Sequence, residues 1–281
     1  MVQDRTAHQA GPSHFLGQTF AKASGIQFLG RDNQRQFAYT TSWGVSTRLI
    51  GTMIMAHADD DGMIVPPRVA PVQIVILPVT PKPETRQEVI DSCEALARTL
   101  RSQTWAGEPL RVHVDKRDIP GGTRNWEWIK KGVPIRIELG PRDITSRSLA
   151  VSRRANGGTG GKGKEIMPKE EFLQNVTEFL EEIQGTLLDR ARALRDAHTR
   201  RLETLEEFVE FFTPKNADKP EIHGGFALMH WAGSSEDEER LSKEHKVTIR
   251  CIPFGDDYAE EGTCFLTGKP SQRRVVFAKS Y

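Results

Sequence analysis

The chain of 281 residues carries 39 Lys and Arg residues against 38 Asp and Glu residues, so its net charge of +1 excludes polyanion binding through overall charge alone. Its hydrophobic and charged fractions, 37% and 27%, are ordinary for a soluble globular protein of one to three domains. With three cysteines, no apolar run long enough for a bilayer and no signal-peptide-like start, the sequence predicts a cytoplasmic protein without disulfides or membrane contact.

The first notable stretch is QAGPSHFLGQ at residues 9–18, which is followed by a short helical pattern around residues 20–22. A lone histidine beside a phenylalanine, as in His14-Phe15, is usually a satisfied core or surface residue. From its own chemistry this stretch has no assigned role.

The stretch at residues 37–67 predicts a strand that leads into a helix. Phe37, Tyr39 and Thr41 alternate in a way that suits a strand. Ser46 is a plausible N-cap, and apolar residues recur at helical spacing over residues 49–54. Arg48 then lies in the first helical turn, where the helix dipole disfavours a cation unless an anion is near. Local sequence alone still favours the simpler alternative, an arginine paired with an aspartate or extended into solvent.

Residues 42–51, SWGVSTRLIG, together with PPRVAP at residues 66–71, resemble the third signature motif of class II aminoacyl-tRNA synthetases, specifically of the prolyl-tRNA synthetase family. In that family the arginine of this motif holds an ATP phosphate, which implies a catalytic and ATP-binding role for Arg48. The resemblance also implies that Ser46 binds ATP and that Ser42, Trp43 and Gly44 form the floor of the proline site.

Residues 9–18 resemble the QAGTSHFLGQ loop of the same family. The resemblance implies that Gln9 contacts ATP and that His14 lines the proline site. Pro12 replaces the family's threonine, an ATP contact, and proline has neither a hydroxyl nor an N–H to donate. No segment matches the family's first two motifs or its proline-selecting loop, so residues 1–67 resemble only the last third of a catalytic domain.

From residue 69 onward, strands and helices alternate. Strands are predicted at residues 72–79, 110–115 and 134–139, and helices at residues 84–103 and 123–131, with Cys93 as inert core packing. Such alternation is typical of an α/β sheet with covered faces. Residues 115–118, DKRD, and residues 131–143, KGVPIRIELGPRD, resemble the anticodon-binding domain of class IIa synthetases.

This region supplies the residue types that bind unpaired RNA: aromatic rings for stacking, cations for phosphates and an acceptor for a guanine edge. The predicted tRNA-binding residues are Arg117, Glu127, Lys131, Arg136 and Arg142. Trp126 and Trp128 of the same region supply the aromatic rings. The alternative, in which one tryptophan packs under the sheet and the charges form a solvated face, remains open for each single residue.

A strand at residues 146–155 precedes a glycine-rich run at residues 157–164 that nearly spells a phosphate-binding P-loop. Glu165 stands where that motif needs Ser or Thr for Mg²⁺, and residues 165–167 indicate a returning strand instead of a helix. The run is therefore interpreted as a hairpin tip whose lysines could contact RNA.

One long helical pattern covers residues 169–212, with Gly185 as a candidate interruption and a run of arginines at residues 190–201. The arginines are typical of a solvated face, with contact to a tRNA backbone as the alternative.

Residues 224–281 predict a small α+β unit with strands at residues 225–231, 247–253 and 274–278 and a helix at residues 236–245. It resembles the C-terminal domain of archaeal and eukaryotic-type prolyl-tRNA synthetases, which ends in a tyrosine, here Tyr281, that folds back on the catalytic domain. Many members hold zinc there with four cysteines. Because Ala232 and Thr267 occupy cysteine positions and leave Cys264, no structural zinc is expected.

The predicted fold class is α/β and α+β: the C-terminal piece of a catalytic antiparallel sheet at residues 1–67, an anticodon-binding α/β domain at residues 68–168, and a helical connection with an α+β domain at residues 169–281. The implied function is that of a proline–tRNA ligase without motifs 1 and 2, with ATP and Mg²⁺ as cofactors, proline and tRNA(Pro) as partners, and a homodimer as the complete enzyme. Two alternatives stay open: a catalytically silent module that recognises the tRNA(Pro) anticodon, and, less favoured, a nucleotide hydrolase using residues 157–164.

Overall fold

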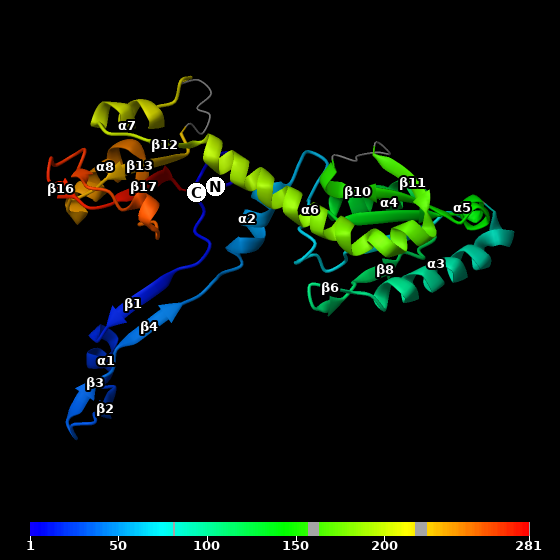
Figure 1. Cartoon of the computed structure of the whole chain (residues 1–281), viewed down its shortest axis with the longest axis horizontal. Helices are drawn as coiled ribbons and strands as arrows, with labels where there is room; N and C mark the ends of the chain where they lie inside the picture. The colour runs from blue at the N-terminus through cyan, green and yellow to red at the C-terminus, as the bar shows by residue number, and fades with distance from the viewer. Residues whose placement is uncertain (81, 157–162, 217–223, 281) are drawn as a thin grey trace. The chain divides into compact units, whose positions relative to one another are not determined.

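The computed structural model describes residues 1–80, 82–156, 163–216 and 224–280. The chain forms two compact units (Figure 1): a central unit, Met53–Ala197, and a terminal unit that combines Met1–Thr52 with His198–Tyr281. Both predicted domain boundaries, after residues 67 and 168, lie inside the central unit. Packing therefore divides the chain at other places, and the three-part division stays a prediction.

The central unit is built on a five-stranded mixed sheet with the strand order β11-β10-β9-β5-β8. Strand β5 is parallel to β8 and β9, whereas β10 is antiparallel to β9 and β11. In chain order the elements are the end of α2 (Arg48–His57), β5 (Ile74–Pro78), α3 (Arg86–Arg101), β6 (Thr104–Trp105), β7 (Glu108–Pro109), β8 (Val112–Val114), α4 (Gly121–Lys130), β9 (Ile135–Leu139), α5 (Pro141–Ser146), β10 (Ser148–Arg153), β11 (Lys164–Pro168) and α6 (Lys169–Ala197).

Strand β5 has every residue buried, as expected of the apolar run from which it forms. Because side chains alternate along a strand, Ile74 and Ile76 face the core shared with α3 and α6. Val75 and Leu77 face the opposite side, where they pack with Trp128 of α4. The predicted α/β sheet with covered faces is confirmed.

Cys93 lies on the inner face of α3 and is fully buried. Burial and, after it, the negative charge of Glu94 raise the pKa of its thiol to about 12. A thiol of that pKa stays protonated at neutral pH, which agrees with the predicted role in packing.

The segment that follows α2 is fastened to the end of α4. Arg154 is fully buried and pairs through both terminal nitrogens with the Asp59 carboxylate, while its Nε donates to the Ile129 carbonyl. The backbones meet so closely here that a Cβ on Gly132, whose φ is 71°, would lie 2.5 Å from the Met63 oxygen. Only glycine fits such a position without displacing the chain.

The terminal unit contains a four-stranded sheet with the order β12-β13-β17-β14, in which β12 is parallel to β13 and the other pairs are antiparallel. Phe208 and Phe212 of α7 pack with Phe277 of β17 in its core. Its elements are β1 (Ser13–Gly17), α1 (Thr19–Ser24), β2 (Gln27–Leu29), β3 (Arg35–Phe37), β4 (Thr40–Trp43), the start of α2, β12 (Thr199–Arg201), α7 (Leu205–Phe212), β13 (Phe226–His230), α8 (Ser235–His245), β14 (Val247–Cys251), β15 (Gly262–Thr263), β16 (Pro270–Ser271) and β17 (Arg274–Lys279).

The prediction of one continuous helix over residues 169–212 is wrong at residues 198–204. Helix α6 runs through Gly185 without interruption and ends at Ala197. The chain then forms β12, and Thr204 starts α7 by accepting a hydrogen bond from the Glu207 N–H at 3.2 Å. Helical periodicity in the charged stretch gave no sign of this break. Strand β12 pairs with β13 through three residues, and so short a strand leaves no alternation of its own in the sequence.

Both ends of the chain meet in the terminal unit. Val2, Thr6 and Ala7 are buried, and the Ala7 N–H donates to the Lys279 carbonyl at 2.9 Å. The predicted fold-back of the tail applies to Tyr281, which lies outside the described residues. So do residues 157–162 of the predicted hairpin tip, although the antiparallel pairing of β10 with β11 confirms the returning strand.

Candidate nucleotide cleft and RNA-binding surface

The segments at residues 9–14 and 42–48 enclose a cleft of about 380 Å³ in the terminal unit. Strands β1 and β4 are antiparallel and place His14 opposite Ser42, while the Gly44 N–H donates to the Pro12 carbonyl at 3.3 Å. The cleft brings together every residue predicted for ATP and proline: Gln9, His14, Ser42, Trp43, Gly44, Ser46 and Arg48. Residues 28 or more positions apart thus meet at one site.

Helix α2 begins at Arg48, as the sequence predicts. Its N-terminus is capped by Ser46, whose hydroxyl accepts a hydrogen bond from the Arg48 N–H at 3.3 Å. Among the described residues the Arg48 guanidinium has no ion-pair partner, so its charge and the helix dipole add at one wall of the cleft. This combination suits a phosphate.

Close backbone contact shapes the floor of the cleft. A Cβ on Gly11 would lie 3.0 Å from the Gly44 oxygen, so this position favours glycine. Pro12 keeps its carbonyl in the β1–β4 pairing and lacks only the donor groups of a threonine. Trp43 is 78% exposed, so the cleft is open on its side.

The lining residues fit nucleotide phosphates better than they fit Mg²⁺. A magnesium ion prefers carboxylate, carbonyl and water oxygens. No described carboxylate lines the cleft, whereas Arg48, Ser46 and Gln9 offer donors for phosphate or base.

The predicted RNA-binding residues of the central unit are organised around a buried carboxylate. Asp115, only 1% exposed, accepts hydrogen bonds from Arg117 at 2.8 and 2.9 Å and from the Trp128 Nε1 at 2.7 Å. Burial alone would raise its pKa, but these hydrogen bonds hold the Asp115 pKa well below its usual range. Arg117 also pairs with Glu127 at 2.8 Å, so Asp115 fixes the position of two predicted RNA contacts.

Helix α4 presents one tryptophan to the core and one to solvent. Trp128 is 7% exposed and packs under the sheet, as the alternative interpretation predicted, and Lys131 lies over its ring at 4.4 Å. Trp126 is 37% exposed and lies 6.0 Å from the Lys130 ammonium. Trp126 and Lys131 thus lie at the surface, and their contact with RNA stays a prediction.

The other two predicted residues lie apart from this group. Arg136 is 3% exposed and donates through Nε to the Asn125 side chain at 3.0 Å, and burial lowers its pKa to about 10. A guanidinium buried between α4 and the sheet supports α4 and offers little surface to a phosphate. Arg142 is exposed at the start of α5, after β9.

The sequence interpretation missed Arg124. This residue is 7% exposed and donates to the carbonyls of Asp115 and Arg117 at 3.1 and 3.0 Å, and to that of Pro78. It thereby joins the end of β5 to the loop that follows β8. Its position four residues before Trp128, on the same helical face, was the available signal.

Comparisons with known proteins match two stretches of the chain to family models. Residues 73–179 match the family model described as "Anticodon binding domain", and residues 219–281 match "Prolyl-tRNA synthetase, C-terminal". Curated relatives include Proline--tRNA ligase 2 of Anaeromyxobacter dehalogenans, 53% identical over 285 aligned positions, and Proline--tRNA ligase of Akkermansia muciniphila, 52% identical over 283. The chain corresponds to the C-terminal portion of prolyl-tRNA synthetases.

A solved prolyl-tRNA synthetase, that of Cryptosporidium parvum in complex with L-proline and AMP, has the same fold. It matches 98% of this chain with a TM-score of 0.80 at 30% identity. The chain spans 55% of that protein, and 55% and 54% of the two curated relatives, each of which covers all of this chain. The predicted fold class and family resemblance are confirmed.

The C-terminal prolyl-tRNA synthetase domain shows how Cys264 is accommodated. Cys264 is 1% exposed; burial would raise its pKa, but hydrogen bonds from the Thr267 hydroxyl and from nearby backbone N–H groups lower it. Within the described ranges, no three His, Cys, Asp or Glu side chains gather as a metal-binding set. The absence of zinc stays a prediction.

Among the described helices, none combines the length and the apolar composition that a membrane crossing requires.

Proposed function

We propose that this chain supplies the ATP-phosphate, proline and anticodon-binding surfaces of a proline–tRNA ligase. One observation carries the proposal: residues predicted from two separate motifs line a single cleft at the start of α2. Arg48 of this cleft has no ion-pair partner among the described residues. The reaction is the ATP-driven activation of proline followed by transfer to tRNA(Pro). Such chemistry needs positioning and charge stabilisation more than a nucleophile.

In the proposed cleft, Arg48 and the first N–H groups of α2 neutralise phosphate charge, and Ser46 and Gln9 orient the nucleotide. His14 and the Ser42–Trp43–Gly44 segment hold proline. Mg²⁺, when bound with ATP, neutralises phosphate oxygens; no described carboxylate in the cleft would hold it. On the central unit, Arg117, Glu127, Lys131 and Arg142 contact the anticodon loop.

The nucleotide part of the proposal is tested by ATP binding and by proline-dependent ATP–pyrophosphate exchange. Replacing Arg48 with alanine should weaken ATP binding at least tenfold, because a charge-assisted hydrogen bond contributes about 1.5–3 kcal/mol. Arg31→Ala removes an equal charge from the β2–β3 turn and serves as the control. Equal ATP affinity in the two variants would exclude Arg48 from the site.

The RNA part is tested by the affinity for tRNA(Pro) and for the same transcript with an altered anticodon. Lys131→Gln should weaken binding of tRNA(Pro) and lower the salt dependence of log K by about one unit. Lys243→Gln, on the exposed face of α8, is the matched control. Equal binding of both transcripts by the unsubstituted chain would contradict anticodon recognition.

A second candidate, a silent tRNA-binding module, is favoured by the openness of the cleft, whose Trp43 and Val45 are 78% and 74% exposed. It predicts anticodon-dependent binding of tRNA(Pro) without pyrophosphate exchange. Exchange activity by this chain would reject it.

A further inference from the structure

A second hollow of about 610 Å³ lies in the terminal unit, between β12, α7 and the start of the chain. Four basic side chains line it, and an apolar part of its wall comes from β12 and α7: Arg5, His198, Arg200, Lys215, Leu202 and Phe211. None of these residues lines the nucleotide cleft or belongs to the RNA-binding residues predicted in the central unit. Arg200 lies in the run of arginines at residues 190–201, for which contact with a tRNA backbone is the alternative prediction. A volume of this size suits a nucleotide-sized ligand.

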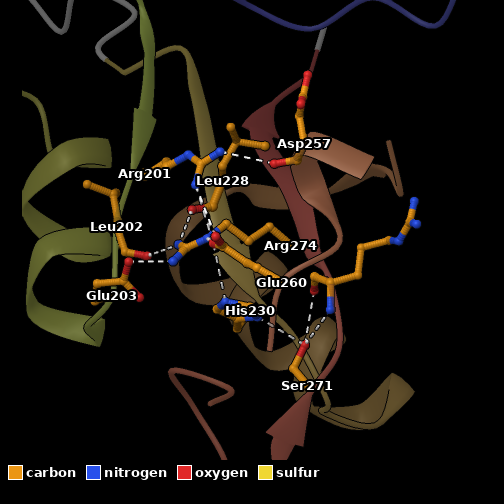
Figure 2. Close-up of polar contacts among 10 residues, drawn as sticks. Arg201, Leu202, Glu203, Leu228, His230, Asp257, Glu260, Ser271 and Arg274 are labelled. Carbon is orange, nitrogen blue, oxygen red and sulfur yellow. Dashed lines mark hydrogen bonds and ion pairs between the residues drawn. The ribbon is translucent and has the colours of Figure 1, made fainter. Parts of the chain in front are cut away.

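Two neighbouring arginines of β12, Arg200 and Arg201, differ in their ion-pair partners. Successive side chains of a strand point to opposite faces, so Arg200 and Arg201 face different surroundings. Arg201 pairs with Glu260 at 3.2 Å and donates to the Asp257 carbonyl at 3.1 Å, as Figure 2 shows. Arg200 donates only to the carbonyl of its neighbour Thr199 among the described contacts, and its charge faces the hollow.

Two carboxylates of the terminal unit, Glu203 and Glu260, belong to the network in Figure 2. The buried Arg274 binds Glu260 through Nε and Glu203 through Nη2 at 2.5 Å, and His230 lies 3.6 Å from Glu260 on the same side. The carboxylates of Glu203 and Glu260 are thus committed to other cations. Among the described residues, no carboxylate forms an ion pair with Arg200.

Arg5 reaches the hollow from an unusual backbone conformation. Its φ is 69°, and its N–H donates to the Val2 carbonyl at 2.9 Å. The left-handed region is unfavourable for a residue with a side chain and persists where the surroundings fix it. His198 lines the hollow together with Arg5 and Arg200. Burial and, after it, the charges of these two arginines lower the pKa of His198.

The hollow is also lined by two carboxylates, Glu207 and Glu210, and that of Glu207 is engaged in hydrogen bonds to the backbone. Glu207 accepts hydrogen bonds from the backbone N–H groups of Glu203 at 2.7 Å and Thr204 at 3.2 Å. These bonds lower its pKa and hold it at the helix start. Arg5, Arg200 and Lys215 therefore exceed the negative charge of Glu207 and Glu210, so the hollow favours an anion.

We propose that this hollow binds one nucleotide unit of RNA, with its phosphate on Arg5, Arg200 and Lys215 and its base or ribose against Leu202 and Phe211. Cations that hold a phosphate beside an aromatic surface are the general means of binding a single strand without reading its sequence. This inference rests on the proposed function, because it makes tRNA the source of the nucleotide.

The experiment compares the full chain with the double variant R5Q/R200Q, using a fluorescent tRNA(Pro) transcript at several salt concentrations. The dissociation constant should rise about tenfold at 0.1 M salt, and the slope of log K against log salt should fall by about 0.7 for the phosphate lost. Arg200→Lys should keep most of the affinity, and Lys243→Gln should change it less than twofold. An equal loss for R200Q and K243Q would overturn the proposal.

Two further arms separate the alternatives. For a transcript with an altered anticodon, the double variant should lose affinity by the same factor, because a phosphate contact reads no sequence. The ratio of the dissociation constants of the double variant and the unsubstituted chain therefore tests the hollow even if anticodon recognition fails. Titration with AMP tests free nucleotide as the source. Unchanged tRNA affinity, with or without loss of AMP binding, would overturn the RNA proposal.

Discussion

The central sheet and the arm formed by residues 13–57, from β1 to α2, both contain predicted elements, yet they differ in how they are covered. In β5 all five residues are buried, and α3 and α6 cover one face of its sheet. In the arm, Phe15, Tyr39 and Trp43 are 74%, 68% and 78% exposed, and α2 has no buried residue despite its apolar spacing. Local sequence specifies an element; only packing gives it most of its stability.

The same contrast separates the two candidate sites. The RNA-binding surface is held by a buried carboxylate and a buried arginine, Asp115 and Arg124. The nucleotide cleft is held by backbone pairing of β1 with β4 and by a capping hydroxyl. We therefore expect substitutions in the arm to change ligand binding without changing the free energy of unfolding. In the central unit we expect them to change both.

The largest expected effect compares two aromatic truncations. Phe172→Ala removes a fully buried ring from α6 and should cost about 3–5 kcal/mol of unfolding free energy. Trp43→Ala removes a larger but mostly exposed ring and should cost less than about 0.5 kcal/mol. Urea unfolding followed by circular dichroism measures both. A Trp43 variant as unstable as the Phe172 variant would erase the contrast.

The next effect concerns Asp115 and pH. Its folded pKa lies below the unfolded value of about 3.9, so its contribution is present above that value and disappears as pH falls further. Asp115→Asn should cost about 1.5–3 kcal/mol at pH 7, where it removes charge-assisted hydrogen bonds, and progressively less below pH 4. Thermal unfolding between pH 7 and pH 2.5 should show the two curves converging. A constant gap would contradict the assignment.

The smallest effect sharpens the account of α6. A Cβ on Gly185 would meet nothing within 4 Å, and the residue lies inside a helix of 29 residues. Gly185→Ala should therefore stabilise the protein by about 0.5–1 kcal/mol, since alanine loses less conformational entropy in a helix. A loss of stability in thermal unfolding would mean that glycine is needed there for flexibility.

Much of the fold follows from short-range pattern. The run that forms β5, the apolar face of α3 and the cap at Ser46 depend on residues within one turn or one strand, and the structure has them as predicted. The break between α6 and α7 depends on pairing with β13, which lies more than twenty residues further along the chain. Periodicity carries no such information.

The sites divide in the same way. Arg48 could be singled out because a cation at a helix start conflicts with the dipole. Arg136 could not be separated from surface arginines, because its burial depends on α4 crossing the sheet. Arg5 and Arg200 were invisible as a pair, since they come together only through the packing of the first residues on the last strands.

That packing also sets an order of events during synthesis. The bridge between Ala7 and Ser280 joins residues separated by almost the whole length of the chain, so it cannot form until the ribosome has delivered β17. The central unit is made of one continuous segment and can collapse while the rest is still being translated. Val2 and Ala7, buried in the folded unit, therefore stay exposed until β17 has been synthesised.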